Sequence, residues 1–471
     1  MGILGDEKGS MSKTVLFLNP PGKALYLRDY YCSKVSKAHY LPQPVDLLMQ
    51  TGWFHARGHQ LVLVDAIVDK LSTVETLVQI VAAQPDMILT LCGSVSFFED
   101  EPFLAEVHRR LPETLILASG DLFLEDPLRF LKRFDWLNGV ITDFFSDGPE
   151  RFLSGQFDGV TGLAYKHKCR FVKAENAKQE AVPLPRHDLF LGKPYRYAFA
   201  TQYPMATVLT AYACPYPCSF CIMSTLGYSA RPVEDLKAEL WGLKEVGVRY
   251  IYFSDQTFFA QEKATNELLD FMIEEVPGFR WCCFSRVDRL DEARMLKMKA
   301  AGCNLVMFGV EWADDAYNAH YKKGYRVAGV RETFAAAQRV GLKTLGTFLL
   351  GVPGQDEKSI HETIDLALEL GADYASFNVA VPRVRTSFRE EALDRGLVSQ
   401  NEIVMDQSGS RPGMGTGVLT PNQVLALKKL AYRRFYLRPS YLIRRLLGIR
   451  SFAELKTHFL EAFYILKGLV T

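Results

Sequence analysis

Three cysteines lie within eight residues near the middle of the chain, at Cys214, Cys218 and Cys221. Their spacing, C-x-x-x-C-x-x-C, lets three thiolates bind three irons of a 4Fe-4S cluster while the fourth iron keeps no protein ligand. A catalytic cluster needs such an open position, because a substrate must reach the metal. A structural zinc site is the alternative, but it requires four ligands, and no fourth Cys or His follows at the usual spacing.

The triplet directly follows the first strand of a predicted strand–helix series. Apolar runs predict strands at 207–209, 250–253, 281–284, 305–308, 344–350 and 375–379. Helical patterns separate them near 233–246, 262–275, 291–301, 327–340 and 357–370. This series predicts a partial (β/α)6 TIM barrel over residues 196–400. The active site of such a barrel gathers at the C-terminal ends of the strands, which is where the triplet lies.

The preceding region has a second strand–helix pattern. Strands are predicted at 15–18, 61–64, 87–91, 115–118 and 139–141, with helices near 45–54 and 99–110. The alternation predicts a doubly wound, Rossmann-like parallel sheet over residues 12–160, with ligands beyond the carboxyl ends of its strands. We expect residues 161–195 to form a linker and residues 401–471 to form a C-terminal helical region.

Composition agrees with a globular enzyme of this α/β class. The 471 residues are 48% hydrophobic and 23% charged. The 55 basic and 54 acidic residues give a net charge of +1, so no nucleic-acid partner is expected. The nine cysteines are too few for a disulfide scaffold. No apolar run approaches about eighteen residues, so we expect a cytoplasmic protein without a membrane-spanning helix.

The triplet, with Phe220 directly before its third cysteine, resembles the signature of the radical S-adenosylmethionine (SAM) superfamily. The resemblance implies a reduced cluster that binds SAM at the open iron. Cleavage of SAM would then give methionine and a 5′-deoxyadenosyl radical, which abstracts hydrogen from an unactivated carbon. It further implies SAM contacts from residues at the strand ends: Phe220, Ser254, Asp255, Arg286, Glu311, Gly351, Val352 and Pro353.

Each of these positions has an implied role. Asp255 would bind the SAM amino group, Arg286 would suit the carboxylate or an ion pair within the barrel, and Glu311 would accept bonds from the ribose hydroxyls. The turn at Gly351 resembles the one that lies beside the adenine. For each polar residue taken alone, a structural ion pair is the alternative.

A doubly wound domain ahead of such a barrel is similar to the cobalamin-binding class of the superfamily. That class includes C-methyltransferases and the cyclase that builds the fifth ring of bacteriochlorophyll. The resemblance implies cobalamin beside five residues: Asn19, Gly93, Ser94, Gly120 and Asp121. Two loops depart from the pattern. Asp121 follows a single Gly120 where the class has paired glycines, and Phe144, Phe145 and Asp147 stand where it has a glycine-rich loop, so they would crowd or repel a corrin.

We therefore expect a radical SAM enzyme that acts on a C–H bond of a largely apolar small molecule, most simply by cobalamin-dependent C-methylation. Oxidation, cyclisation or rearrangement without cobalamin is the alternative, with a degenerate first domain. A non-catalytic protein with a structural metal is a third hypothesis. The enzyme hypotheses imply a flavodoxin- or ferredoxin-type electron donor.

Two further segments carry expectations. Residues 423–471 contain ten basic and two acidic residues among many aromatic ones. They predict a helical cap with a solvated basic face, with peripheral membrane contact as the alternative. Residues 26–32 could bind substrate, and Cys32 could be a further ligand or a radical quencher; an ordinary packed loop with a buried thiol is the alternative.

Overall fold

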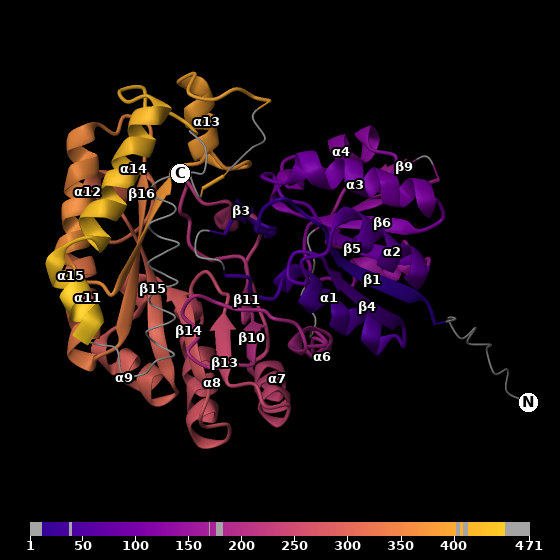
Figure 1. Ribbon diagram of the computed structural model, residues 1–471, viewed down its shortest axis with the longest axis horizontal. Coiled ribbons are helices and arrows are strands. Elements are labelled where there is room, and N and C mark those ends of the chain that lie inside the picture. Colours follow the sequence, from indigo (N-terminus) through magenta and orange to yellow (C-terminus); the bar gives the residue numbers. More distant parts are fainter. Residues whose placement is uncertain are drawn as a thin grey trace, which may run out of the picture. The chain divides into compact units, whose positions relative to one another are not determined.

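The computed structural model describes residues 12–36, 40–168, 170–175, 182–401, 406–407 and 413–447. The chain divides into two compact units (Figure 1). The first comprises Met1–Gly22, Asp46–Cys92 and Phe97–Gly192, and the second comprises Lys23–Val45, Gly93–Ser96 and Lys193–Thr471. The structure thus assigns residues 23–45 and 93–96 to the second unit, although both segments fall within the range expected for the first domain.

The first unit is built on a seven-stranded sheet in the order β4-β1-β5-β6-β7-β8-β9. Its parallel strands are β1 (Thr14–Asn19), β4 (Gln60–Asp65), β5 (Met87–Leu91), β6 (Leu115–Ser119) and β7 (Gly139–Ile141), which confirms the five predicted strands. Antiparallel β8 (Leu163–His167) and β9 (Arg170–Val172) extend the sheet. These two strands occupy part of the expected linker. They are short and partly exposed, so they carry little hydrophobic pattern.

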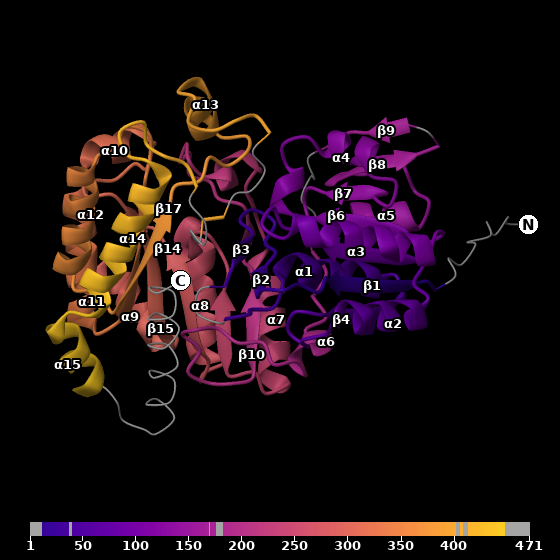
Figure 2. The same ribbon diagram turned by 45° about the horizontal axis from the view of Figure 1, so that its top comes forward.

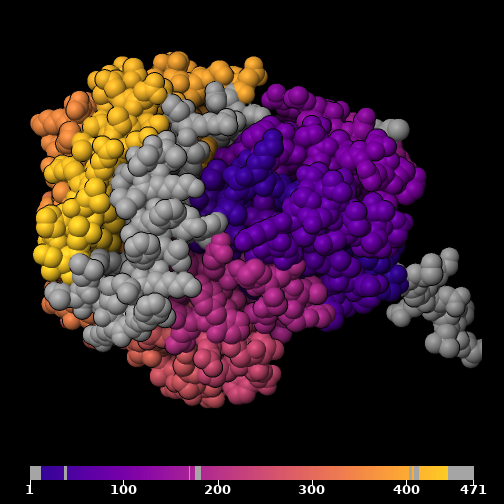
Figure 3. Space-filling model, in the orientation of Figure 1, coloured from indigo at the N-terminus to yellow at the C-terminus, as the bar shows by residue number. Residues whose placement is uncertain are grey.

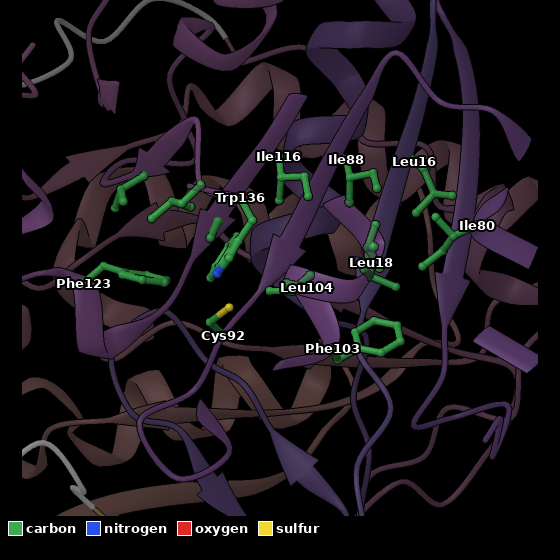
Figure 4. Close-up of a cluster of buried hydrophobic side chains, with 14 of the residues drawn as sticks. Leu16, Leu18, Ile80, Ile88, Cys92, Phe103, Leu104, Ile116, Phe123 and Trp136 are labelled. Carbon is green, nitrogen blue, oxygen red and sulfur yellow. The ribbon is translucent and has the colours of Figure 1, made fainter. Parts of the chain in front are cut away.

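Helices bury an apolar face against this sheet. They are α1 (Val45–Ala56), α2 (Thr73–Ala83), α3 (Phe97–Arg110), α4 (Pro127–Arg133), α5 (Gly148–Leu153) and α6 (Asp188–Leu191). The capping box of Ser72 and Glu75 begins α2. Leu16, Ile88 and Ile116 from neighbouring strands contact Ile80 and Leu104 from helices in a single buried cluster (Figure 4).

The second unit contains a six-stranded, wholly parallel sheet in the order β10-β13-β14-β15-β16-β17. The strands are β10 (Met205–Val208), β13 (Tyr250–Phe253), β14 (Arg280–Ser285), β15 (Cys303–Glu311), β16 (Lys343–Leu350) and β17 (Tyr374–Val379). All six predicted strands are confirmed, in chain order across the sheet, as a partial barrel requires. Their carboxyl ends therefore share one edge.

Helices run between these strands and lie along the outside of the sheet (Figures 1 and 2). They are α7 (Val233–Glu245), α8 (Glu262–Glu274), α9 (Glu292–Ala300), α11 (Val327–Val340) and α12 (Glu357–Glu369). The short helices α10 (Asp315–His320) and α13 (Ser387–Asp394) follow β15 and β17. Two small antiparallel pairs complete the unit, β2 (Tyr26–Leu27) with β3 (Lys34–Val35) and β11 (Ala211–Tyr212) with β12 (Ser229–Ala230).

The edge strand β17 is covered by α14 (Pro421–Tyr436). The Tyr436 hydroxyl lies 2.7 Å from the carbonyl oxygen of Ala375 and 3.1 Å from its amide nitrogen. One helical turn earlier, the Tyr432 hydroxyl lies 3.3 Å from both backbone polar atoms of Phe377. Two tyrosine side chains of α14 thus satisfy backbone groups of alternate residues along the outer side of this edge strand.

The helical cap expected at the C-terminus is present over its described part. Helices α14 and α15 (Pro439–Leu447), yellow in Figure 3, lie on the surface of the second unit. Arg434 pairs with Asp365 at 2.8 Å, and Arg438 donates to the carbonyl of Leu368. Residues 448–471 of the tail lie outside the described residues. A search of the described helices finds none long and apolar enough to span a membrane.

Candidate functional site

The cysteine triplet lies in the loop between β11 and the short helix Ile222–Thr225, beyond the carboxyl end of β10. The loop is tied to the rest of the unit by its backbone, since the Ser219 N–H donates to Tyr321 and its carbonyl accepts from Phe388. Ala213, directly before the first cysteine, has a positive φ of 60°, which turns the chain out of β11. The loop thus presents its thiols at the edge that the other strand ends share.

Two thiols of the triplet, those of Cys214 and Cys221, are poor anions without a metal. Burial raises the pKa of Cys214 and raises that of Cys221 to about 12. A thiolate at these positions therefore needs a bound cation, as iron in a cluster supplies. Across the described ranges, no three His, Cys, Asp or Glu side chains are close enough to hold one metal ion.

Arg286, directly after β14, is held beside the triplet. Its Nη1 donates to Cys218 Sγ at 3.7 Å, and Asp288 accepts from Nε and Nη2 at 2.8 and 2.9 Å. The guanidinium lies over the ring of Tyr216 at 4.0 Å and faces Tyr325 at 5.1 Å. Burial alone would lower the pKa of Arg286, but Asp288 outweighs this effect and the pKa is raised. The side chain therefore stays charged.

Glu311 ends β15, at a shift in the register between β15 and β16 and with a positive φ of 68°. Its Oε1 lies 2.8 Å from Nζ of Lys323, and both side chains are buried. A Cβ on Gly309 would come within 3 Å of both groups, so a larger residue there would displace the pair. The ammonium of Lys323 also lies 5.5 Å from the ring centre of Phe220, inside the cysteine loop.

Asp255 follows β13 and is buried. Its Oδ1 accepts from the Thr210 N–H at 3.0 Å, from the Thr210 hydroxyl at 2.6 Å and from the Ala211 N–H at 2.9 Å. Within the described part of the chain, neither its buried Oδ2 nor the buried hydroxyl of the neighbouring Ser254 has a hydrogen-bond partner. Burial raises the pKa of Asp255 to about 6 despite the donated bonds. A buried carboxylate oxygen without a donor is a place for a cationic group.

The remaining residues expected to contact SAM are apolar or glycine. Phe220 packs against Trp312 and Tyr321, with ring centres 5.4 and 6.3 Å apart. Gly351 has a positive φ of 88°, and its N–H donates to Gln355 at 2.7 Å. Val352 and Pro353 are buried after β16, and Val352 belongs to the same apolar cluster as Trp312. The structure therefore places all eight expected SAM residues, with the triplet, in one unit at the strand ends.

The five residues expected to face cobalamin are all buried. Asn19, Gly120 and Asp121 belong to the first unit, and Gly93 and Ser94 belong to the second. In the first unit, Asn19 donates to Asp65 at 2.9 Å, and a Cβ on Gly120 would lie 1.7 Å from the carbonyl oxygen of Cys92. In the second, the Ser94 hydroxyl lies 3.0 Å from that of Ser33. These contacts are made within the protein, so they do not by themselves mark a cobalamin site.

The loop after β7 differs from its expected arrangement. Phe144 and Phe145 are buried and pack edge to face, with ring centres 5.6 Å apart. Their carbonyls accept from Gln50 at 2.7 Å and Trp53 at 3.0 Å, both on α1. The loop therefore presents no exposed phenyl ring at the end of β7. That these two rings and Asp147 crowd or repel a corrin stays a prediction.

The segment around Cys32 belongs to the second unit. Tyr30 stacks on Tyr212, just before the cysteine loop, with ring centres 5.4 Å apart. Cys32 is buried, and its Sγ lies 2.8 Å from Nη2 of Arg383, beyond β17. Tyr30 and Cys32 thus pack within the barrel unit, in agreement with the packed loop.

Sequence reasoning missed several residues that complete the site, above all Lys323, Tyr325, Tyr216 and Thr210. Tyr325 donates its hydroxyl to the carbonyl of Gly309, and Arg286 donates to the carbonyl of Lys323. In the sequence, Lys323 and Tyr325 lie in the loop between α10 and α11 and do not directly follow a strand. Their position beside the cysteine loop depends on how the chain folds, so no local pattern in the sequence predicts it.

Comparison with known proteins agrees with this geometry. Residues 208–367 match the model of the Radical SAM superfamily. A Pyrococcus horikoshii protein named "Uncharacterized methyltransferase PH0819" is 26% identical, over 82% of this chain and 86% of its own length. The anaerobic magnesium-protoporphyrin IX monomethyl ester cyclase of Rubrivivax gelatinosus is 21% identical, over 91% of this chain and 78% of its own length.

Solved structures share the fold. The radical SAM methyltransferase TsrM from Kitasatospora setae, with cobalamin and a [4Fe-4S] cluster bound, has a TM-score of 0.67 at 17% identity and covers 91% of this chain and 90% of its own. The cobalamin-dependent radical enzyme OxsB has a TM-score of 0.68 at 13% identity, covering 98% of this chain and 72% of its own. At these identities the likeness shows the fold alone.

The fold is thus a cobalamin-binding-type doubly wound unit with a radical SAM barrel. Residues 208–367 are thus a radical SAM domain, and the protein is an enzyme. A radical SAM domain means a 4Fe-4S cluster and SAM as cofactors.

Proposed function

We propose that Cys214, Cys218 and Cys221 bind three irons of the cluster and that SAM occupies the fourth. The observation that carries this proposal is the loop that presents three thiols at the shared strand ends, Cys218 buried and Cys214 and Cys221 half-buried, in the same unit as the buried Oδ2 of Asp255. A reduced cluster held by these thiols would supply one electron to the SAM sulfonium, whose C–S bond would break to give methionine and a 5′-deoxyadenosyl radical.

The chain's own residues bind and orient SAM. Oδ2 of Asp255 accepts from the ammonium of SAM, because it is a buried carboxylate oxygen to which no donor among the described residues is hydrogen-bonded. Glu311 accepts from the ribose hydroxyls while Lys323 holds its side chain in place. The turn Gly351–Val352–Pro353 would lie beside the adenine, and Phe220, which packs against Trp312 and Tyr321, would help to exclude water.

We infer that the reaction functionalises a C–H bond of a largely apolar small molecule, with cobalamin-dependent C-methylation as the leading possibility. Two facts support it: a relative that covers most of both chains is named a methyltransferase, and two cobalamin-dependent enzymes share the fold. An external one-electron donor of the flavodoxin or ferredoxin type would reduce the cluster.

Oxidation or cyclisation without cobalamin is the second candidate. It is favoured by the first unit itself, where the amide of Asn19 is engaged by Asp65 and the space beside Gly120 is filled by the backbone of Cys92. The similarity to a cyclase also supports it.

Anaerobic reconstitution with iron, sulfide and hydroxocobalamin separates the two candidates. C-methylation predicts a stoichiometric corrin on the purified protein and S-adenosylhomocysteine among the products, since a methyl group leaves SAM. A full cluster with no retained corrin, and with 5′-deoxyadenosine and methionine as the sole products from SAM, would refute C-methylation and support the second candidate.

A further inference from the structure

The guanidinium of Arg286 has five N–H bonds, and four of them are engaged within the protein. Nε and Nη2 donate to the two oxygens of Asp288. Nη2 also donates to the carbonyl of Lys323 at 2.6 Å, and Nη1 donates to Cys218 Sγ at 3.7 Å. Only one Nη1–H is left, so Arg286 cannot grip the SAM carboxylate with two parallel bonds.

Aromatic rings and hydrogen-bond acceptors together fix the orientation of the Arg286 side chain. Tyr216 covers one part of the guanidinium at 4.0 Å and Tyr325 another at 5.1 Å. Arg286 itself is 6% exposed. A cation held by a bidentate carboxylate and two rings keeps its position whether or not a ligand is present. The N–H that Arg286 donates to Cys218 is therefore held in place beside the cysteine loop.

A fixed N–H donor changes the electronic properties of the sulfur that accepts from it. Hydrogen bonds to cluster sulfurs and nearby charge are among the factors that set the reduction potential. Reduction adds an electron to the cluster, so a donor and a positive charge at one ligand stabilise the reduced form more than the oxidised form.

We propose that Arg286 is a positioning residue that raises the reduction potential of the cluster through its N–H bond to Cys218, with Asp288 holding it in register. This inference rests on the proposed function, because it requires the triplet to bind the cluster. Of the two roles expected from the sequence, it keeps the ion pair within the barrel, here with Asp288, and replaces the contact with the SAM carboxylate.

The test is a redox titration of the reconstituted protein without SAM, followed by electron paramagnetic resonance. The variants are Arg286→Gln, which removes the charge, and Arg286→Lys, which keeps the charge but not the planar fork. Arg331→Gln is the matched control, since Arg331 pairs with Glu369 on the outside of the barrel. Iron content and SAM affinity are measured on each protein.

The midpoint potential of Arg286→Gln should be more negative than that of the wild type, and that of Arg286→Lys should shift the same way by less. Arg331→Gln should not shift. If either Arg286 variant holds a full cluster and keeps the wild-type midpoint potential, the proposal is overturned. If only the affinity for SAM changes, Arg286 binds the SAM carboxylate instead, and the proposal is likewise overturned. Loss of iron in both would overturn it too, by assigning Arg286 to cluster assembly.

Different results would refute the proposed function and the inference about Arg286. If the wild type itself binds no 4Fe-4S cluster, the proposed function fails. If the wild type binds the cluster and cleaves SAM but its potential is indifferent to Arg286, only this inference fails.

Discussion

Lys323 Nζ lies 2.8 Å from Oε1 of Glu311, and the two side chains form a buried ion pair at the end of β15. Burial alone would lower the pKa of Lys323, but Glu311 and Tyr325 outweigh it and raise the pKa. The ammonium therefore remains charged beside the cysteine loop. Breaking such a pair leaves an uncompensated charge in the interior.

We expect Glu311→Gln to lower the free energy of unfolding by about 3 kcal/mol, the lower end of the range for breaking a buried pair. The double variant Glu311→Gln/Lys323→Met should recover part of the loss, because it removes the stranded charge. Denaturant unfolding of the wild type, the two single variants Glu311→Gln and Lys323→Met, and the double variant measures the coupling free energy between the two residues. Additive losses would show that the two residues are not coupled.

Asp255 should make SAM binding depend on pH. Its pKa is raised by burial from 3.8 to about 6, so the folded protein without SAM binds a proton there more readily than the unfolded chain does. The contribution of this group to stability is therefore greatest below about pH 4 and is lost as the pH rises through about 6. The SAM ammonium favours the ionised form, so SAM affinity should rise with pH through the same range.

The check on Asp255 is equilibrium SAM binding between pH 5 and pH 8. Asp255→Asn should remove the pH step and weaken binding by roughly tenfold to a hundredfold, the loss expected for a hydrogen bond to a charged group. An unchanged pH profile in Asp255→Asn would assign the ammonium to another residue.

Gly351 should tolerate no side chain. Its φ of 88° favours glycine, and a Cβ would lie 2.6 Å from Cγ1 of Val424 on α14. Gly351→Ala should destabilise the protein by about 2 kcal/mol through strain and overpacking together, and it should weaken SAM binding. Gly396→Ala is the matched control, with a φ of 66° and no atom within 4 Å of the added Cβ. Thermal unfolding should show a clearly smaller loss for the control; equal losses would contradict the packing argument.

Tyr436 should contribute to stability through its hydroxyl. Tyr436→Phe leaves the backbone groups of Ala375 without their partner on the edge strand, at a cost of about 1–3 kcal/mol. Tyr432→Phe should cost less, because its bonds to Phe377 are longer. Denaturant midpoints measure both effects. An unchanged midpoint in Tyr436→Phe would mean that water replaces the hydroxyl.

Much of the fold was predictable because its strands are short apolar runs between turn residues. The parallel strands of the two sheets lie within three residues of their predicted bounds. Parallel strands bring their carboxyl ends to one edge, so residues far apart in the chain, such as Asp255 and Glu311, could be assigned to one site from order alone. The cysteine spacing marked the loop after β11.

Other features have no local signal. The short strands β8 and β9 lie where a linker was expected, since strands of three to five residues with polar faces show little periodicity. Lys323 was missed because its partner Glu311 is chosen by the packing of the loop before α11. The donor count of Arg286 likewise depends on Asp288, Lys323 and Cys218 together, which sequence order does not reveal.

The central claim is that the cysteine triplet binds a cluster whose open iron receives SAM. Its most direct test is the release of 5′-deoxyadenosine from SAM by the anaerobically reconstituted protein with a strong reductant. The wild type should bind four irons per chain, as a 4Fe-4S cluster requires, and release the product. Cys303→Ala, which removes a buried thiol outside the loop, should do the same, whereas Cys218→Ala should release none. Full activity in Cys218→Ala, or intact SAM with the wild-type cluster in place, would contradict the account.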